Sequence, residues 1–297
     1  MRIGALILLF VAFQLWGTGL ATSQAQDRLA TEFNGQLAAV AAPPTTIPNA
    51  PEPPEPPVTA PSDLPVPEAG DPVARIEIPR IGVDFIVLQG VDLRWLQDGP
   101  GHFPQTPLPG QAGNAAIAGH RTTYKAPFNR IDELNPGDEI TITSLQGTFT
   151  YRVNANPEPS GDGVSGHFIV GSSDITILDQ NVGNRLTLMA CHPKFSAAQR
   201  IVVTATLVSN PAPTTSQGDL SDLVTTDASV DALAGGDSGA WQGALLLSAL
   251  AATLWFGTWF AARSWKRWPA YAIGTPLVFV TLFFAFQNIA RLLPASY

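Results

Sequence analysis

The chain has 297 residues, a formal net charge of −8 and a single cysteine. The acidic balance and the lack of a basic stripe argue against nucleic-acid binding, and one cysteine excludes an intrachain disulfide. A mean hydropathy of +0.13 together with 27 prolines is unusual for one soluble domain. The two features are segregated along the chain, because the apolar residues gather at both ends and the prolines near the front.

The first element is an apolar run over residues 3–20, which follows Arg2 and carries no charge before Asp27. The run is long enough to span the hydrocarbon core of a bilayer, whereas a secretory signal has a shorter apolar region. We therefore predict an uncleaved signal anchor, a transmembrane helix, within residues 1–26. Small and polar residues at 21–26 leave a cleaved signal peptide as the alternative.

Residues 27–72 are predicted to form a Pro-rich extracytoplasmic linker. The part from 43 to 72 holds 12 of the 27 prolines and almost no large apolar side chain. Such a composition cannot build a core and favours an extended polyproline II conformation, so we expect it to hold a domain away from the membrane. A second flexible linker, 209–239, is acidic and rich in Ser, Thr, Asp and Gly.

Residues 73–208 remain as one domain, long enough for a single hydrophobic core. Their apolar runs are short, have a period of two residues and are bounded by Gly, Asn or Asp, as in β-strands. The predicted strands lie in 74–90, 138–154, 114–120, 174–179, 184–191 and 200–208, and the short helical candidates are 92–99 and 126–138. This pattern favours an all-β barrel or sandwich and leaves the strand order open.

Residues 240–297 are predicted to form a C-terminal transmembrane hairpin from two apolar segments, 240–262 and 270–290. Between them, residues 263–268 carry three cations and two tryptophans, which is typical of a short cytoplasmic loop. The resulting topology places the N-terminus inside the cell, residues 21–239 outside, and a short C-terminal tail outside. The alternative is a helical hairpin buried in a soluble protein, which these flanking residues disfavour.

Three reactive side chains stand at the ends of predicted strands: Cys191 ends an apolar run, Arg200 begins the next one, and His120 ends an earlier one. A nearby cation stabilises a thiolate nucleophile, an imidazole protonates a leaving amine, and a guanidinium holds a developing oxyanion. Each residue alone also fits a structural role, since a lone Cys is often a small core side chain. A single Cys provides no spacing for a structural zinc site, and we expect no metal.

The run TLMACHPKFSAAQR, residues 187–200, resembles the Cys-to-Arg signature of sortases, the transpeptidases that attach surface proteins to Gram-positive cell walls. Residues 99–138 are similar to the segment around the catalytic His of that family, particularly in the class E enzymes of actinobacteria. The resemblance covers about 73–208. It implies an all-β fold, a closed eight-stranded sortase-type barrel with short helices.

The same resemblance implies the roles of the three reactive residues. Cys191 is then the nucleophile, His120 the general acid/base, and Arg200 the residue that binds the substrate backbone and the oxyanion. The implied reaction cleaves an LPXTG-like sorting signal between Thr and Gly through a thioacyl intermediate, and class E enzymes favour LAXTG. No cofactor is implied.

The implied partners are surface proteins that bear the sorting signal, membrane lipid, and the amine of a lipid II-type cell-wall precursor. A pilin lysine is the alternative acceptor, and no nucleic acid is expected. The enzyme is expected in the cell membrane with its catalytic domain outside the cytoplasm.

Two positions depart from the family pattern. Ala190 stands where a Thr is usual just before the Cys, and Lys125 stands where a Gly is common. We expect Ala190 and Tyr124 to contact substrate, with Tyr124 near the second residue of the signal because a phenol ring both fills space and donates a hydrogen bond. A Tyr in the core or at the surface is the alternative.

Two other function classes compete with the transpeptidase. One is a binding or scaffold protein that keeps the barrel and has lost turnover, which only Ala190 supports. The other is a papain-like hydrolase, which needs its Cys near the mature N-terminus, whereas Cys191 lies late in the chain and in a predicted strand.

Overall fold

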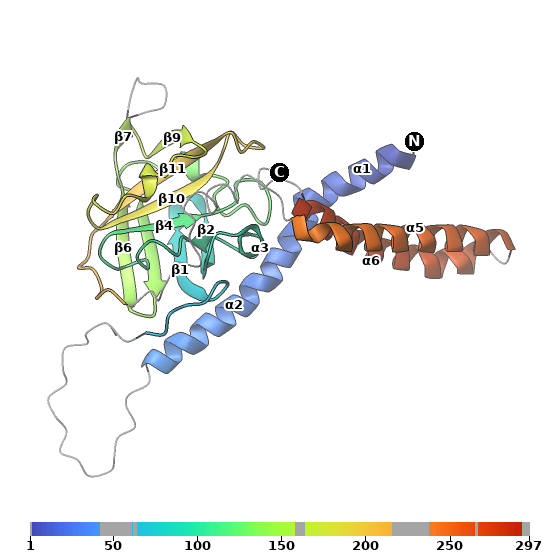
Figure 1. The fold of residues 1–297 in the computed structure, drawn as a ribbon, viewed down its shortest axis with the longest axis horizontal. Coiled ribbons are helices and arrows are strands. Elements are labelled where there is room, and N and C mark those ends of the chain that lie inside the picture. The colour runs from blue at the N-terminus through green and yellow to red at the C-terminus, as the bar shows by residue number, and fades with distance from the viewer. Residues whose placement is uncertain are drawn as a thin grey trace, which may run out of the picture.

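The computed structural model of the chain describes residues 2–41, 61, 64–157, 164–215, 238–264 and 267–292. A β-barrel lies at one end of the molecule, and helices from both ends of the chain extend away from it on the same side (Figure 1). The Pro-rich stretch 42–60 and most of the second predicted linker, 216–237, lie outside the described residues.

Eight strands close the barrel. Around the ring they are β10 (Arg185–His192), β4 (Asn114–Ala118), β3 (Gly101–His102), β2 (Val83–Gln89), β1 (Pro72–Ile78), β5 (Glu139–Ser144), β6 (Gly147–Val153) and β11 (Gln199–Leu207). Because β10 also pairs with β11, the two ends of this order are joined. The predicted closed eight-stranded barrel is confirmed.

Smaller elements decorate the ring. The strand β9 (His167–Gly171) pairs with β11, and β7 (Asn156–Pro157) pairs with β8 (Val164–Ser165) in a separate two-stranded sheet. The short helix α3 (Leu93–Leu96) lies within the predicted segment 92–99.

Alternate side chains of the strands fill the barrel, as the period of two residues predicts. Fully buried members of this core include Ile76, Ile117, Ile142, Leu188 and Val203. Burial of an aliphatic side chain of this size stabilises the fold by about 1.5–3 kcal/mol relative to leaving it exposed. The core therefore fixes which face of each strand points outward.

Two segments of the domain differ from the predicted secondary structure. Residues 174–179, predicted as a strand, contain a 3-10 turn at Thr176–Leu178. Asp174 Oδ1 accepts hydrogen bonds from the backbone N of Thr176 at 3.0 Å and from its hydroxyl at 2.6 Å, which favours a turn over a strand. The helical candidate 126–138 contains only a 3-10 turn, Ile131–Glu133.

The N-terminal segment is one continuous helix from Arg2 to Ala41, made of α1 (Arg2–Ala12), a π-helical turn (Phe13–Gly17) and α2 (Thr18–Ala41). The sequence assigned residues 27–41 to the extended linker, but these residues are helical. In Figure 1, α2 lies along the barrel, so the helix reaches the barrel before the Pro-rich stretch begins.

Side-chain hydrogen bonds attach α2 to the barrel. The Gln26 amide donates to the carbonyl oxygens of Ile86 and Asp98 at 3.0 and 2.9 Å, and its oxygen accepts from the Ile86 N–H at 2.7 Å. Thr22 donates to the carbonyl of Gln97 at 2.8 Å. Because Gln26 satisfies both backbone groups of Ile86, the helix docks at one register on the barrel.

The C-terminal segment is a hairpin of α5 (Trp241–Ser264) and α6 (Arg267–Leu292). Both helices are long and apolar enough to cross a membrane, and most of their apolar residues are not buried. Small residues line the contact between them: a Cβ on Gly243 would meet Asn288, and one on Gly274 would meet Thr258. Close packing over small residues is typical of helices in membranes.

Candidate active site

The barrel brings the three predicted reactive residues together. Cys191, near the end of β10, pairs directly with Arg200 in β11. On the other side of β10, the parallel strand β4 places Ala118 beside Met189, and the N–H of Gly119 donates to the Met189 carbonyl at 3.1 Å. Cys191 and His120 each lie two residues past that pair. The thiol is therefore flanked by the histidine on one neighbouring strand end and the arginine on the other.

The side chain of Cys191 lies on the outer face of the barrel wall. Residues two apart share a face, and Met189 packs in an apolar cluster separate from the core, together with Ala118 and Val202. Leu178 in the turn after β9 belongs to the same cluster, and Phe168 in β9 packs against it. Cys191 thus lies at the edge of a buried apolar cluster built from five segments.

Ala190 faces the opposite way. Its side chain is 3% exposed and belongs to the core cluster with Leu188 and Ile201. The structure therefore places the methyl group of this expected substrate-binding residue in the core, because neighbouring residues of a strand point to opposite faces.

The site favours the protonated thiol of Cys191. Burial raises the pKa of Cys191, while Arg200 and Arg121 lower it by a smaller amount. A base must then remove the proton before the sulfur attacks a carbonyl. His120 is buried beside the thiol, and its carbonyl oxygen accepts a hydrogen bond from Phe128 N at 3.1 Å.

Arg200 is 2% exposed, and only part of its donor capacity is used. Nη1 donates to the carbonyl oxygens of Ala197 and Gln199 at 2.8 and 3.1 Å. Nε and Nη2 have no hydrogen-bond partner among the residues that the structure describes. Leaving a buried donor unsatisfied costs about 1–3 kcal/mol, so these two nitrogens suit an acceptor brought by a ligand.

Sequence reasoning missed a second buried arginine, Arg121, which is 4% exposed. Nη1 lies 2.9 Å from Nδ1 of His192 and donates to the carbonyl of Cys191 at 3.4 Å, and Nη2 pairs with Asp132 Oδ2 at 3.1 Å. The side chain thereby connects the loop after His120 with the end of β10. Its position next to His120 is the one signal in the sequence that points to it.

The charges around Arg121 fit these contacts. Burial raises the pKa of Asp132, but Arg121 and a backbone hydrogen bond together have the larger effect. The pKa is therefore below its ordinary value, and the carboxylate is ionised at neutral pH. Burial and Arg121 both lower the pKa of His192, so its ring is neutral there and accepts the hydrogen bond from Arg121.

The loop after His120 adopts an unusual backbone. Tyr124, Lys125 and Ala126 have φ values of 53°, 60° and 42°, in the left-handed region that residues other than Gly seldom enter. This geometry explains why Gly is suited to the position of Lys125. Tyr124 is half-buried, with its ring centroid 4.8 Å from that of His120 and its N–H donating to Thr18 Oγ1 at 3.4 Å.

A different histidine, His102 in β3, is structural. Its ring is fully buried, with Nδ1 2.7 Å from Gln89 Oε1 and Nε2 2.9 Å from the Pro107 carbonyl. Burial lowers its pKa to about 4, so the ring is neutral. Among the described residues, no group of three or more His, Cys, Asp or Glu side chains is placed to hold a metal ion.

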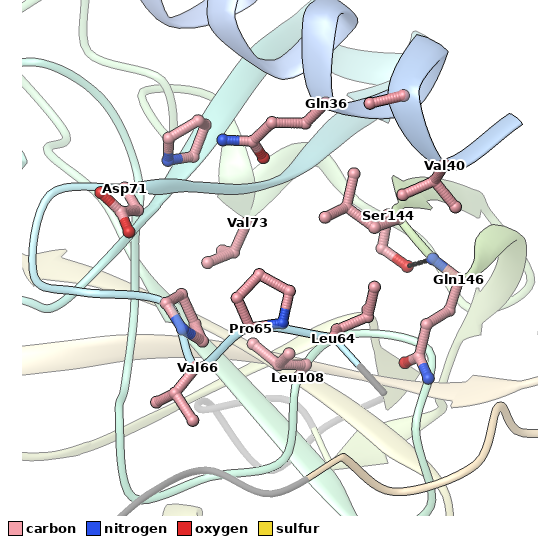
Figure 2. Close-up of a pocket in the computed structure, with 14 residues that line it drawn as sticks. Gln36, Val40, Leu64, Pro65, Val66, Asp71, Val73, Leu108, Ser144 and Gln146 are labelled. Atoms are coloured by element: carbon pink, nitrogen blue, oxygen red, sulfur yellow. Dashed lines mark hydrogen bonds between the residues drawn. The ribbon is translucent and has the colours of Figure 1, made fainter. Parts of the chain in front are cut away.

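A pocket of about 300 Å³ lies between the end of α2, the segment before β1 and the turn between β5 and β6 (Figure 2). Figure 2 shows Val40 and Gln36 of the helix on one side and Leu64, Val66 and Leu108 on the other. None of the three reactive residues lines it, so this pocket is separate from the candidate active site.

Comparisons with known proteins place these features in context. Residues 76–208 match the family model described as a sortase domain. Sortase SrtE1 of Streptomyces coelicolor is 26% identical over 220 residues, which are 69% of this chain and 54% of that protein. Sortase D of Bacillus subtilis is 30% identical over 128 residues, 43% of this chain and 58% of that protein. The chain spans about half the length of the curated relatives it matches.

Two similar solved structures each match about half of this chain. Sortase E from Streptomyces avermitilis is 32% identical, and the match covers 48% of this chain and 93% of the other, with a TM-score of 0.40. Sortase E1 from Streptomyces coelicolor, solved with a tripeptide in the active site, is 26% identical, and the match covers 48% of this chain and 91% of the other, with a TM-score of 0.41. The barrel itself is established by the strand pairing of this chain.

Proposed function

We propose that the protein is a membrane-anchored cysteine transpeptidase, because residues 76–208 match the family model described as a sortase domain. It cleaves a sorting signal between Thr and Gly and transfers the new carboxyl end to an amine. The observation that carries the proposal is the position of Cys191 between His120 and Arg200 on neighbouring strands of the closed barrel.

In the proposed reaction, His120 removes the proton of the Cys191 thiol and the sulfur attacks the carbonyl carbon of the Thr. The two nitrogens of Arg200 that have no acceptor among the described residues, Nε and Nη2, stabilise the oxyanion. His120 then protonates the leaving Gly amine, the C–N bond breaks, and a thioacyl ester remains on the sulfur. An incoming amine attacks this ester, loses a proton to His120 and restores the thiol.

The proposed substrate is an LPXTG-like signal, in particular LAXTG. Phe168 and Val170 of β9, which pack on the outer apolar cluster and are only partly buried, support a subsite for the leucine side chain. The similarity to class E sortases supports Ala as the second residue of the signal. Tyr124, which packs on the ring of His120, is proposed to approach that second residue.

We place the barrel outside the cell, anchored by the N-terminal helix and by the hairpin of α5 and α6. The two apolar helices and the position of α1 on the same side of the barrel support this arrangement (Figure 1). The proposed acceptor is the amine of a lipid II-type cell-wall precursor, with a pilin lysine as the alternative.

The test uses a labelled LAXTG peptide and the full chain in detergent. We expect Cys191→Ala to reduce cleavage by at least about 1,000-fold, since no other group supplies the nucleophile. Arg200→Lys is expected to lose about 100-fold, because an ammonium lacks the planar set of donors. Unchanged thermal unfolding of Cys191→Ala is the control. Turnover by Cys191→Ala would refute the mechanism, whereas no cleavage by the parent chain would favour the scaffold protein.

A further inference from the structure

A second pocket, of about 210 Å³, lies where the barrel meets helices from both ends of the chain. Its walls come from the N-terminal helix, the segment after α3, the loop after His120 and the last turns of α6. Polar side chains make up much of the lining: Gln97, Asp98, Tyr124, Gln287, Asn288 and Arg291.

The charges at this pocket leave one net positive charge for an anion. Arg291 and Asp98 both line it, and burial raises the pKa of Asp98 while Arg28 and Arg291 both lower it. Two guanidinium groups therefore act where one carboxyl group carries the opposing charge. Arginine is well suited to phosphate because its donors match the oxygens in geometry and charge.

The neutral side chains add donors. The amides of Gln97 and Gln287 line the pocket, and Tyr124 contributes a phenol. Burial raises the pKa of Tyr124 to about 12, so this hydroxyl keeps its proton at neutral pH. Thr18 does not add one, because its hydroxyl already donates to the Gln14 carbonyl at 2.9 Å.

The pocket lies at the level where the apolar helices end. α6 has 26 residues, a length of about 39 Å that suffices to cross a bilayer. Arg291 is in its last turn, and on the bilayer side of it the rings of Phe13 and Phe283 pack at 5.3 Å and those of Phe10 and Phe286 at 5.2 Å. Aromatic packing gives way to polar and cationic side chains at this pocket, as it does at the depth of the lipid headgroups.

The pocket also touches the candidate active site. Tyr124 lines the pocket, and its ring centroid lies 4.8 Å from that of His120. The N–H of the same residue donates to Thr18 Oγ1 in the N-terminal helix at 3.4 Å. A ligand in the pocket therefore contacts the residue that packs against the imidazole.

We propose that this pocket binds the phosphate group of an anionic membrane lipid and that its occupancy orders the loop that carries His120. The effect on the loop rests on the function proposed above, whereas lipid binding is independent of peptide cleavage. The lipid thereby makes the catalytic loop responsive to insertion in the membrane.

The test measures lipid binding to the full chain in detergent by native mass spectrometry. Probes are phosphatidylglycerol, phosphatidylcholine and inorganic phosphate. We expect phosphatidylglycerol to bind at least about 10-fold more tightly than phosphatidylcholine, and Arg291→Gln to remove that preference. The matched control is Arg267→Gln, which removes an exposed cation from the other end of α6 and should keep the preference.

Equal loss of preference in both variants would reduce the effect to general charge attraction and overturn the site. Equal binding of inorganic phosphate would overturn the lipid as its source. If Arg291→Gln fails to fold, Gln97→Leu removes a donor from the barrel side of the pocket and should weaken phosphatidylglycerol binding about 10-fold.

Hydrogen exchange tests the effect on the loop. Phosphatidylglycerol should slow exchange of the amides at 120–126 in the parent chain and leave them unchanged in Arg291→Gln. If the parent chain prefers phosphatidylglycerol but does not cleave LAXTG, the proposed function is refuted and the lipid site is kept. If the parent chain cleaves LAXTG but shows no lipid preference, the lipid site alone is refuted.

Discussion

Arg121 links the two strand ends that carry the reactive residues. It contacts the carbonyl of Cys191 and the ring of His192 on one side, and Asp132 on the other. Its charge also lowers the pKa of the Cys191 thiol, against the larger effect of burial. We therefore propose that Arg121 positions the proposed nucleophile through these contacts.

We therefore expect Arg121→Gln to raise the pKa of Cys191 and to lower kcat/KM by about 10- to 100-fold. The pH dependence of iodoacetamide labelling measures the thiol directly and should move to higher pH. Arg121→Lys, which keeps the charge and loses the planar donors, should restore the labelling profile more than kcat/KM. The control is Arg130→Gln, at an exposed arginine paired with Glu133. A labelling profile of Arg121→Gln that matches the control would contradict the assignment.

Lys125 tests the backbone of the same loop. Its φ of 60° disfavours any residue with a Cβ by about 1–2 kcal/mol. Lys125→Gly and Lys125→Ala both remove the cation that lies 5.8 Å from the Phe85 ring centroid, so their difference isolates the backbone. We expect the Gly variant to be more stable than the Ala variant by about 1 kcal/mol in thermal unfolding. Equal stabilities of the Gly and Ala variants would contradict the prediction that the backbone at residue 125 is strained.

At the residue scale, the motif predicted which residues come together but not how each one points. Cys191, His120 and Arg200 meet because their strand ends are neighbours in the barrel. Ala190 was assigned to the substrate site from its place beside Cys191, although that adjacency turns its methyl group to the core. Arg121 was missed because a cation after a histidine has no distinctive pattern until a fold buries it.

The short strand β3 shows how one element couples the barrel to pH. His102 is neutral in the folded chain because burial lowers its pKa to about 4, whereas an exposed histidine has a pKa of about 6.5. Between these values the unfolded chain binds more protons, so the free energy of unfolding decreases as the pH falls from 6.5 to 4. The full effect is about 3 kcal/mol.

His102→Gln should therefore flatten the dependence of stability on pH in this window. Thermal unfolding at pH 7, 5.5 and 4.5 measures the slope for both chains, so a lower absolute stability of the variant does not obscure the result. The neighbouring Gln89, which contacts the ring, stays in both chains. Parallel slopes would mean that His102 is not the group that titrates.

At the element scale, long strands were predictable and contact-dependent elements were not. The period of two residues predicted β1, β2, β5, β6, β10 and β11 because each has one face in the core. The two residues of β3 are too few to show a period. The helix over 27–41 was missed because these residues were assigned to the same linker as the prolines that begin at residue 43. Its own residues are good helix formers, and Ala25 and Phe33 of α2 are 1% exposed against their surroundings.

The arrangement of the whole molecule depends on which side of the membrane each part occupies. On a Cys191→Ala background, Ser173→Cys in the barrel should react with an impermeant maleimide in intact cells. Ser264→Cys, exposed at the end of α5, should react only after the membrane is made permeable. Labelling of Ser264→Cys in intact cells would refute the topology with three spans, and protection of Ser173→Cys would place the barrel inside.

Composition predicted the hairpin and resemblance predicted the barrel, but neither predicted how they are joined. The docking of α2 depends on Gln26 meeting the backbone of Ile86, two positions far apart in the sequence. A glutamine in a polar stretch carries no mark of such a contact. Tertiary hydrogen bonds of this kind become visible only when both partners are placed.

If the proposed topology holds, the docked helix α2 also determines the height of the barrel above the bilayer. A barrel on a loose tether would sweep a wide volume above the bilayer, whereas one held by a helix that enters the bilayer stays at a single height. The helix has 24 residues, so it spans about 36 Å from its first to its last turn. A substrate that is itself embedded in the membrane must then present its scissile bond at that height. Under the proposed function, the distance between a sorting motif and its own membrane anchor would then decide which substrates reach Cys191.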